Sequence, residues 1–156
     1  MLSEDQKQVN RFILDFKDGK RYASAWASKV VARRLNGIDC HGLVLCPVPA
    51  SSQDKTDQRY NYFMCDVCRR TGAADGLQHL HVVGTKHQLH TSGIVRNDDY
   101  KVVIDANYFT GKQVVVFDDI FTTGGSARRF ARQLQAAGAR VVGGIFLSET
   151  RLLGVA

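Results

Sequence analysis

The sequence predicts an α/β fold: a doubly wound, mostly parallel sheet of about five strands flanked by helices. One observation is a strand–helix–strand pattern over residues 113–147, where only Gly138, Ala139 and Arg140 join the helix to the second strand. Another is the unbroken apolar run within residues 42–49, which is typical of a strand buried on both faces. Because helices alternate with such strands, we expect parallel strands covered on both sides.

Two helices are expected before the first strand. Residues 5–18 carry apolar side chains at positions 9, 12, 13 and 16, which is helical spacing, and Gly19 breaks the pattern. Residues 22–35 have a second apolar face. This helix is expected to end at Asn36 and Gly37, because glycine readily adopts the left-handed conformation found after helix C-termini.

The other elements follow in order. Both prolines of the chain, Pro47 and Pro49, close the first strand and shape a loop over residues 50–57. Periodicity is weak over residues 71–99. The further predicted elements are a helix at 59–70, short strands near 80–83 and 101–105, a strong strand at 113–117, a loop at 118–125, a helix at 126–137 and a strand at 141–147.

Length and composition indicate a single domain over residues 1–156. Lys and Arg number 21 against 15 Asp and Glu, and this surplus suits nucleic acid, a polyphosphate ligand or solubility alone. No apolar run reaches the roughly 18 to 20 residues of a membrane helix. The polar start shows no secretory signal. We therefore expect a cytoplasmic protein without membrane contact.

The cysteines and histidines carry no strong metal signature. Cys65 and Cys68 form a CxxC pair, but no second pair follows at zinc-site spacing. On a helix they would share a face as small, partly buried side chains, with a redox or metal pair as the alternative. Four histidines of the middle segment are expected to be loop residues: His79, His81, His87 and His90.

The most informative residues follow the strand at 113–117. Asp118 and Asp119 stand at its carboxyl end, where doubly wound sheets bind ligands. A polar loop then leads into a helix and comprises Thr122, Thr123, Gly124, Gly125 and Ser126. Backbone N–H groups at a helix N-terminus bind phosphate. Adjacent carboxylates can accept hydrogen bonds from a vicinal diol, attract Mg²⁺ and stabilise positive charge on a sugar ring.

Other interpretations of this segment are weaker. No Gly-Lys-Ser/Thr follows the glycines, as it would in a Walker A loop, and no GxGxxG dinucleotide fingerprint is present. A plain turn with Ser126 as the helix N-cap is the structural alternative. A receiver or phosphotransfer domain would also use an acidic pair, but the phosphate loop directly after Asp119 argues against it.

The segment VVVFDDIFTTGGS, residues 114–126, resembles the 13-residue signature of type I phosphoribosyltransferases. Phe121 departs from that pattern, since a smaller aliphatic residue is usual there. LCPVPAS, residues 45–51, resembles the pyrophosphate loop of the competence-associated ComF branch. Residues 58–61, QRYN, stand at that branch's Arg-aromatic-Asn element without its usual glycine. Residues 16–35 are similar to its lysine-led opening, whereas its N-terminal zinc finger has no counterpart.

The resemblance implies a type I fold with a small hood from the N-terminal and C-terminal segments, and 5-phosphoribosyl 1-diphosphate (PRPP) as ligand. It assigns the ribose hydroxyls to Asp118 and Asp119, with Mg²⁺ bound there directly or indirectly. It assigns the 5-phosphate to the loop at 122–126. The residues it assigns to pyrophosphate are Pro49, Ala50, Ser51 and Ser52, assisted by Arg59.

Type I enzymes also close a mobile loop over the substrate, which excludes water. The resemblance places that loop at residues 72–100. Basic residues in this loop or directly after it could supply charge to the departing pyrophosphate, and spacing alone does not choose among Lys86, His87, Arg96 and Lys101.

The leading hypothesis is Mg²⁺-dependent transfer of the phosphoribosyl group from PRPP to an unidentified nitrogenous base or amine, with release of pyrophosphate. Positioning and electrostatics would suffice, without a covalent enzyme intermediate. The alternative is a non-catalytic PRPP- or nucleotide-binding regulator, or a DNA-uptake accessory protein, on the same fold. A homodimer is compatible with either hypothesis.

Overall fold

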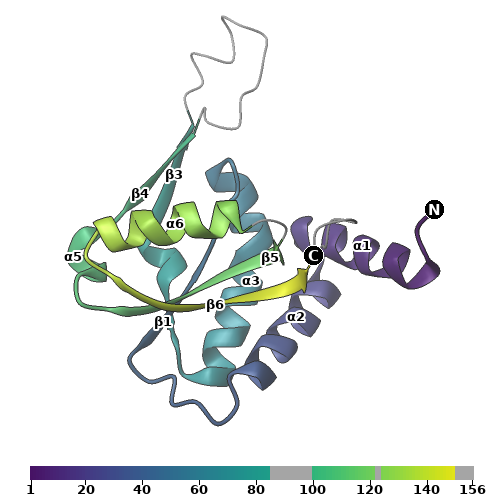
Figure 1. The fold of residues 1–156 in the computed structure, drawn as a ribbon, viewed down its shortest axis with the longest axis horizontal. Helices are drawn as coiled ribbons and strands as arrows, with labels where there is room; N and C mark the ends of the chain where they lie inside the picture. Colours follow the sequence, from purple (N-terminus) through teal and green to yellow (C-terminus); the bar gives the residue numbers. More distant parts are fainter. Residues whose placement is uncertain (85–99, 122–123, 150–156) are drawn as a thin grey trace, which may run out of the picture.

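One parallel sheet of four strands forms the centre of the protein (Figure 1). The structure is a computed structural model that describes residues 1–84, 100–121 and 124–149, without the side chains at 121 and 149. The strand order is β2-β1-β5-β6. The strands are β1 (Leu43–Pro47), β2 (Ala74–Asp75), β5 (Gln113–Phe121) and β6 (Arg140–Glu149). The predicted fold class is confirmed.

The two middle strands that the sequence predicts do not join this sheet. β3 (Leu80–Gly84) and β4 (Tyr100–Ile104) pair with each other in an antiparallel hairpin. The main sheet therefore has four strands rather than about five. In Figure 1 the hairpin projects from one side of the molecule.

Helices cover both faces of the sheet. They are α1 (Glu4–Lys17), α2 (Arg21–Arg34), α3 (Gln53–Thr71), the short α5 (Ala106–Phe109) and α6 (Gly125–Ala136), with one 3-10 turn at Gly76–His79. In Figure 1, α1 lies beyond the arrowheads of β5 and β6, and its N-terminal end projects outward. None of the helices in the described ranges is long and apolar enough to cross a membrane.

The strand order reverses between β1 and β5. The chain leaves β1 through α3 to reach β2 on one side, and it leaves β5 through α6 to reach β6 on the other. β1 and β5 are parallel neighbours, and Pro47, the last residue of β1, lies opposite Phe117. In open α/β sheets, ligands bind outside the carboxyl ends at such a reversal. The topology alone therefore directs attention to the residues that follow Pro47 and Phe117.

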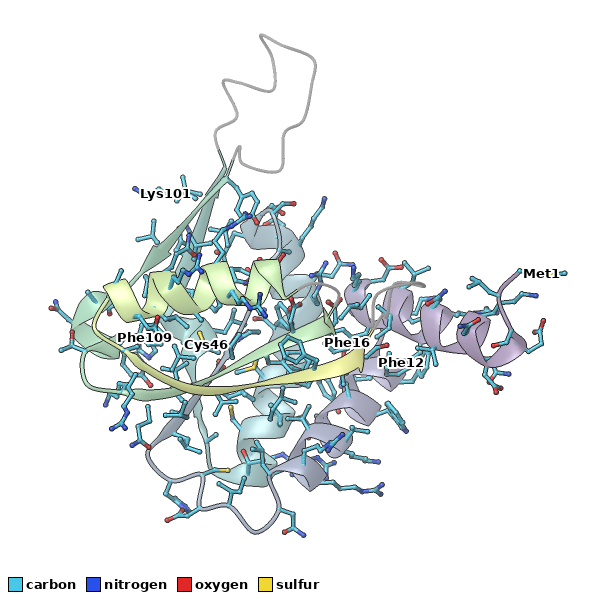
Figure 2. The ribbon with its side chains drawn as sticks, viewed as in Figure 1. Met1, Phe12, Phe16, Cys46, Lys101 and Phe109 are labelled. Atoms are coloured by element: carbon cyan, nitrogen blue, oxygen red, sulfur yellow. The ribbon has the colours of Figure 1, made fainter. Side chains whose placement is uncertain are left out.

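Alternate residues of the sheet face two separate cores, as strand geometry requires. Leu45, Val115 and Phe117 pack with the three N-terminal helices. The opposite face packs against α5, α6 and the hairpin, and includes Val44, Cys46, Val114 and Val116. In Figure 2, Phe16 lies near the carboxyl end of β5, whereas Cys46 and Phe109 lie toward the α5 side.

An aromatic cluster fixes the end of β5. The Phe117 ring centroid lies 4.5 Å from that of Phe63, 6.0 Å from Phe16 and 6.2 Å from Tyr60. All four side chains are fully buried. The cluster joins α1, α3 and β5 directly before Asp118, so it fixes the backbone from which the acidic pair projects.

Two of the predicted loop boundaries are wrong. α3 begins at Gln53, six residues before the predicted start at 59, because the Ser52 hydroxyl accepts the Lys55 backbone N–H at 3.1 Å as an N-cap. β5 continues through Phe121 because β6 pairs with it as far as Glu149. Asp118 and Asp119 therefore lie within a strand and not in a loop.

Replacement of Phe117 by alanine should lower the free energy of unfolding by about 3 to 5 kcal/mol, the usual cost of a cavity left by a buried phenylalanine. Urea denaturation measures this change. Val142→Ala, on an exposed position of β6, is the control and should change stability by less than about 1 kcal/mol. Equal effects of the two substitutions would contradict the role of the aromatic cluster.

Candidate functional site

The acidic pair lies at the carboxyl end of β5, as the sequence predicts. Asp118 stands opposite Phe146 of β6 and is half-buried, while Asp119 is only 4% exposed. One oxygen of each carboxylate binds the chain locally. Asp118 Oδ1 accepts the Asp119 backbone N–H and Asp119 Oδ1 accepts the Ile120 N–H, both at 2.8 Å. These two bonds fix the orientation of the pair.

The second oxygen of Asp119 has unused binding capacity. Asp119 Oδ2 is buried and has no hydrogen-bond partner in the part of the chain that the structure describes. Its ion-pair partner, Lys17 Nζ, lies at 3.7 Å, which is too far for a hydrogen bond. Buried polar atoms in proteins are nearly always hydrogen-bonded. An unpartnered carboxylate oxygen at this edge of the sheet is therefore suited to accept a ligand hydroxyl or to bind a cation.

The environment of the pair changes the proton affinity of Asp118. Burial raises the pKa of Asp118 from 3.8 to about 7, and the side-chain hydrogen bond and negative charge of Asp119 act in the same direction. The positive charge of Arg59 opposes this rise. Near neutral pH Asp118 therefore titrates, so a cation or ligand that favours its ionised form can shift its protonation.

Arg59 and Tyr60 of α3 bring basic and hydroxyl groups to the same place. Arg59 is half-buried, and its Nε is buried without a hydrogen-bond partner among the described residues. Tyr60 donates its hydroxyl to the Val48 carbonyl at 2.8 Å, and burial raises the pKa of Tyr60. The Val48 N–H in turn donates to the Phe117 carbonyl at 2.8 Å. Tyr60 thus connects α3 to the chain that follows β1.

The segment that follows β1 is short and firmly held. The Ala50 N–H donates to Thr56 Oγ1 at 3.0 Å, and Thr56 Oγ1 donates to the Ser52 carbonyl at 2.7 Å. Among the residues predicted to bind pyrophosphate, Pro49 and Ala50 are buried and Ser51 is exposed. The Ser52 hydroxyl serves as the cap of α3. A ligand would therefore meet Ser51 and the N-terminal end of α3 here.

Part of the predicted phosphate loop can be located. Thr122 and Thr123 lie outside the described residues. Gly124 is the N-cap of α6 and has φ 77°, a left-handed conformation that favours glycine. Ser126 lies inside the helix, so the alternative in which Ser126 is the N-cap is wrong. The N-terminal end of α6, with its partial positive charge, begins four residues after the β5 strand.

A small cavity is bordered by one residue from each of two predicted subsites. It measures about 90 Å³ and is bordered by Pro49, Ser126 and Arg129, together with Tyr100 of β4. Residues assigned to pyrophosphate and to 5-phosphate from separate parts of the sequence thus lie at one place. Arg129 and Lys17 are basic residues that the sequence analysis did not select. Arg129 follows the predicted phosphate loop by one helical turn, and Lys17 lies in the segment 16–35 that resembles the lysine-led opening.

Several predicted residues lie elsewhere or outside the described ranges. Lys86, His87, His90 and Arg96 are outside them. Lys101 is exposed on β4, on the hairpin in Figure 2. The His79 ring stacks on Tyr108, with centroids 3.4 Å apart, which is a packing role. No group of three metal-binding side chains occurs within residues 1–84, 100–121 and 124–149.

The cysteine pair lies in the C-terminal half of α3. Cys65 is exposed, unlike the partly buried side chain that we expected, while Cys68 is half-buried. Burial raises the pKa of Cys68 to about 12. Because the thiolate is the reactive form, this environment disfavours a redox or metal role for Cys68.

Comparison with known proteins identifies the fold. No known family profile and no curated protein matches the sequence. The structure is similar to an adenine phosphoribosyltransferase from Thermoanaerobacter pseudethanolicus, with a TM-score of 0.52 and 20% identity over 83% of this chain and 70% of that one. It is also similar to an adenine phosphoribosyltransferase from Rhodothermus marinus, with a TM-score of 0.50 and 15% identity over 84% and 69%. The fold is therefore that of type I phosphoribosyltransferases.

The raised pKa of Asp118 predicts how stability depends on pH. A carboxyl group whose pKa is higher in the folded state favours folding less as pH rises from about 4 to about 7. Asp118→Asn removes this loss. From pH 5 to pH 8, the free energy of unfolding of the variant should rise by on the order of 2 kcal/mol relative to that of the wild type. Urea denaturation at both pH values measures this change. Asp5→Asn, on an exposed residue, is the control. A difference that does not change with pH would contradict the environment described for Asp118.

Proposed function

We propose that this protein binds PRPP and, with Mg²⁺, transfers its phosphoribosyl group to a nitrogenous acceptor. The observation that carries the proposal is the acidic pair at the point where the strand order reverses, where Asp119 Oδ2 is buried and has no hydrogen-bond partner among the described residues. A ribose hydroxyl could donate a hydrogen bond to this oxygen. The shared fold with phosphoribosyltransferases supports the same assignment.

The proposed ligand extends in two directions from the acidic pair. Its 5-phosphate would lie at the N-terminal end of α6, where backbone N–H groups and the helix dipole favour an anion. Its pyrophosphate would lie toward Ser51 and Ser52, at the end of β1. Arg59 could donate hydrogen bonds to it, since its Nε has no described partner.

In the proposed reaction, the acceptor nitrogen attacks C1 of the ribose. The new C–N bond forms as the bond from C1 to the pyrophosphate oxygen breaks, and its electron pair leaves with pyrophosphate. The acceptor then loses a proton to solvent. Asp118 and Asp119 would hold the ribose hydroxyls and stabilise the positive charge that develops on the sugar ring.

The acidic pair also fits the expected metal. Carboxylate oxygens are the ligands that Mg²⁺ prefers, and it usually retains several waters or substrate oxygens. Asp118 and Asp119 would hold the ion directly or through water, and the ion would neutralise charge on pyrophosphate. With two carboxylates as its protein ligands, the ion would keep coordination positions for waters or substrate oxygens.

A second candidate function is binding of PRPP or nucleotide without turnover, in a regulator or a DNA-uptake accessory protein. The exposed face of α6 favours it, because Arg128, Arg129 and Arg132 project there and this helix contains no acidic residue. Single-stranded DNA that binds with a steep salt dependence, combined with no pyrophosphate release, would support this alternative.

Three further proposals rest on the sequence alone: membership of the ComF branch, a cytoplasmic location and a homodimer.

The proposal is tested by isothermal titration of PRPP into the protein with Mg²⁺. The wild type should bind, and the double variant Asp118→Asn/Asp119→Asn should lose at least about a hundredfold in affinity, because charge-assisted hydrogen bonds to both carboxylates are lost. The control is Asp5→Asn/Asp39→Asn, which removes the same charge from exposed positions. Unchanged affinity in the first double variant would refute the site.

Turnover is tested separately by pyrophosphate release with PRPP, Mg²⁺ and a series of purines, pyrimidines and amines. Adenine is the first acceptor to test, since it is named for the two enzymes that share the fold. Release with one acceptor and not in its absence would support the transferase. PRPP binding without release for any acceptor would favour the second candidate function.

A further inference from the structure

The N-terminal helix brings a positive charge to the acidic pair. Lys17 is the last residue of α1, and its Nζ lies 3.7 Å from Asp119 Oδ2. The Lys17 side chain is 37% exposed, whereas that of Asp119 is 6% exposed. The ammonium group of Lys17 is therefore accessible to solvent beside a carboxylate that is buried.

No residue in the described ranges accepts a hydrogen bond from Lys17. An ammonium group has three donors, and the distance to Asp119 is too long for any of them to make a hydrogen bond. Lys17 has no other hydrogen-bond or ion-pair partner among the described residues. By contrast, Lys7 and Lys20 on or beside the same helix bind Glu4 at 2.7 Å and Asp15 at 2.8 Å. Lys17 is thus the lysine of this helix that can donate to a ligand.

The position of Lys17 is set by contacts between α1 and α3. The Gln58 side-chain amide donates to the Asp18 carbonyl at 2.9 Å. Gly19 packs so closely that an added Cβ would lie 2.2 Å from the Gln58 carbonyl oxygen, and its φ of 73° also favours glycine. Gln58 precedes Arg59, whose charge acts on Asp118. This contact between α1 and α3 is therefore made by residues adjacent in sequence to both cations.

We propose that Lys17 is a further ligand-binding residue, whose ammonium donates to an anionic oxygen of the bound phosphorylated sugar while it stays paired with Asp119. The inference rests on the proposed function, because PRPP is the ligand considered. Its physical reason is electrostatic: a polyanion that approaches two carboxylates is repelled unless nearby cations offset their charge. Lys17 and Arg59 provide that offset from α1 and α3.

The affinity test uses isothermal titration of PRPP with Mg²⁺. Lys17→Gln should weaken binding at least about tenfold, which corresponds to the loss of one charge-assisted hydrogen bond. Lys17→Arg keeps the charge and the donors and should bind within about threefold of the wild type. Lys7→Gln makes the same change of charge on the same helix and should leave the affinity unchanged.

A second measurement detects contact directly in the wild type, and so does not depend on the folding of any variant. Lysines are acylated with and without PRPP and quantified by mass spectrometry. PRPP should protect Lys17 and leave the modification of Lys7 unchanged.

The outcomes separate this inference from the proposed function. A wild type that binds PRPP, with Lys17→Gln binding equally well and Lys17 unprotected, would overturn this inference alone. Tighter binding by Lys17→Gln would also overturn it, since Lys17 would then compete with the ligand for Asp119. A wild type that does not bind PRPP would overturn the proposed function and this inference with it.

Discussion

Asp119 is buried, and one of its oxygens has no hydrogen-bond partner within the described part of the chain; the site is arranged around this constraint. A carboxylate that is 4% exposed needs compensating charge, and the structure supplies it from Lys17 on α1, with Arg59 of α3 offsetting the charge of neighbouring Asp118. The strand that carries Asp119 must also be held firmly, since small shifts would change these distances. The aromatic cluster around Phe117 does this directly before the acidic pair. The helices α1 and α3 and the sheet therefore meet near one buried side chain.

The same arrangement is unfavourable for stability in the absence of a ligand. Buried atoms of Asp119 and Arg59 that lack a hydrogen bond to any described residue cost free energy, and burial makes ionisation of Asp118 less favourable. A ligand that donates hydroxyls to the carboxylates and accepts from the guanidinium would relieve all three effects. Binding sites commonly retain such unfavourable interactions, because the ligand supplies the missing partners. The distribution of unsatisfied groups in this protein is thus an argument for a ligand, independent of the sequence motif.

The sequence predicted which helices and strands form better than it predicted the contacts between them. The apolar run of β1 and the strand–helix–strand pattern after residue 112 were sufficient for the fold class, and the order of acids, glycines and hydroxyls was sufficient to select Asp118 and Asp119. The extension of β5 was not predictable from propensity, since aspartate is disfavoured in strands and pairing with β6 overrides this preference. The early start of α3 depends on Ser52 as a cap, a signal obscured by the two prolines before it. The role proposed for Lys17 depends on its contact with Asp119, about a hundred positions away in the sequence. A local sequence pattern does not reveal such a contact.

The acidic pair is proposed to bind the hydroxyls of a ribose phosphate. A direct test compares the dissociation constants of ribose 5-phosphate and 2-deoxyribose 5-phosphate, which differ by one hydroxyl and share the same phosphate. The deoxy sugar should bind at least about tenfold more weakly, because one hydrogen bond to a carboxylate is lost. Equal affinity for the two sugars would show that the phosphate alone is bound, and would refute this role of the acidic pair.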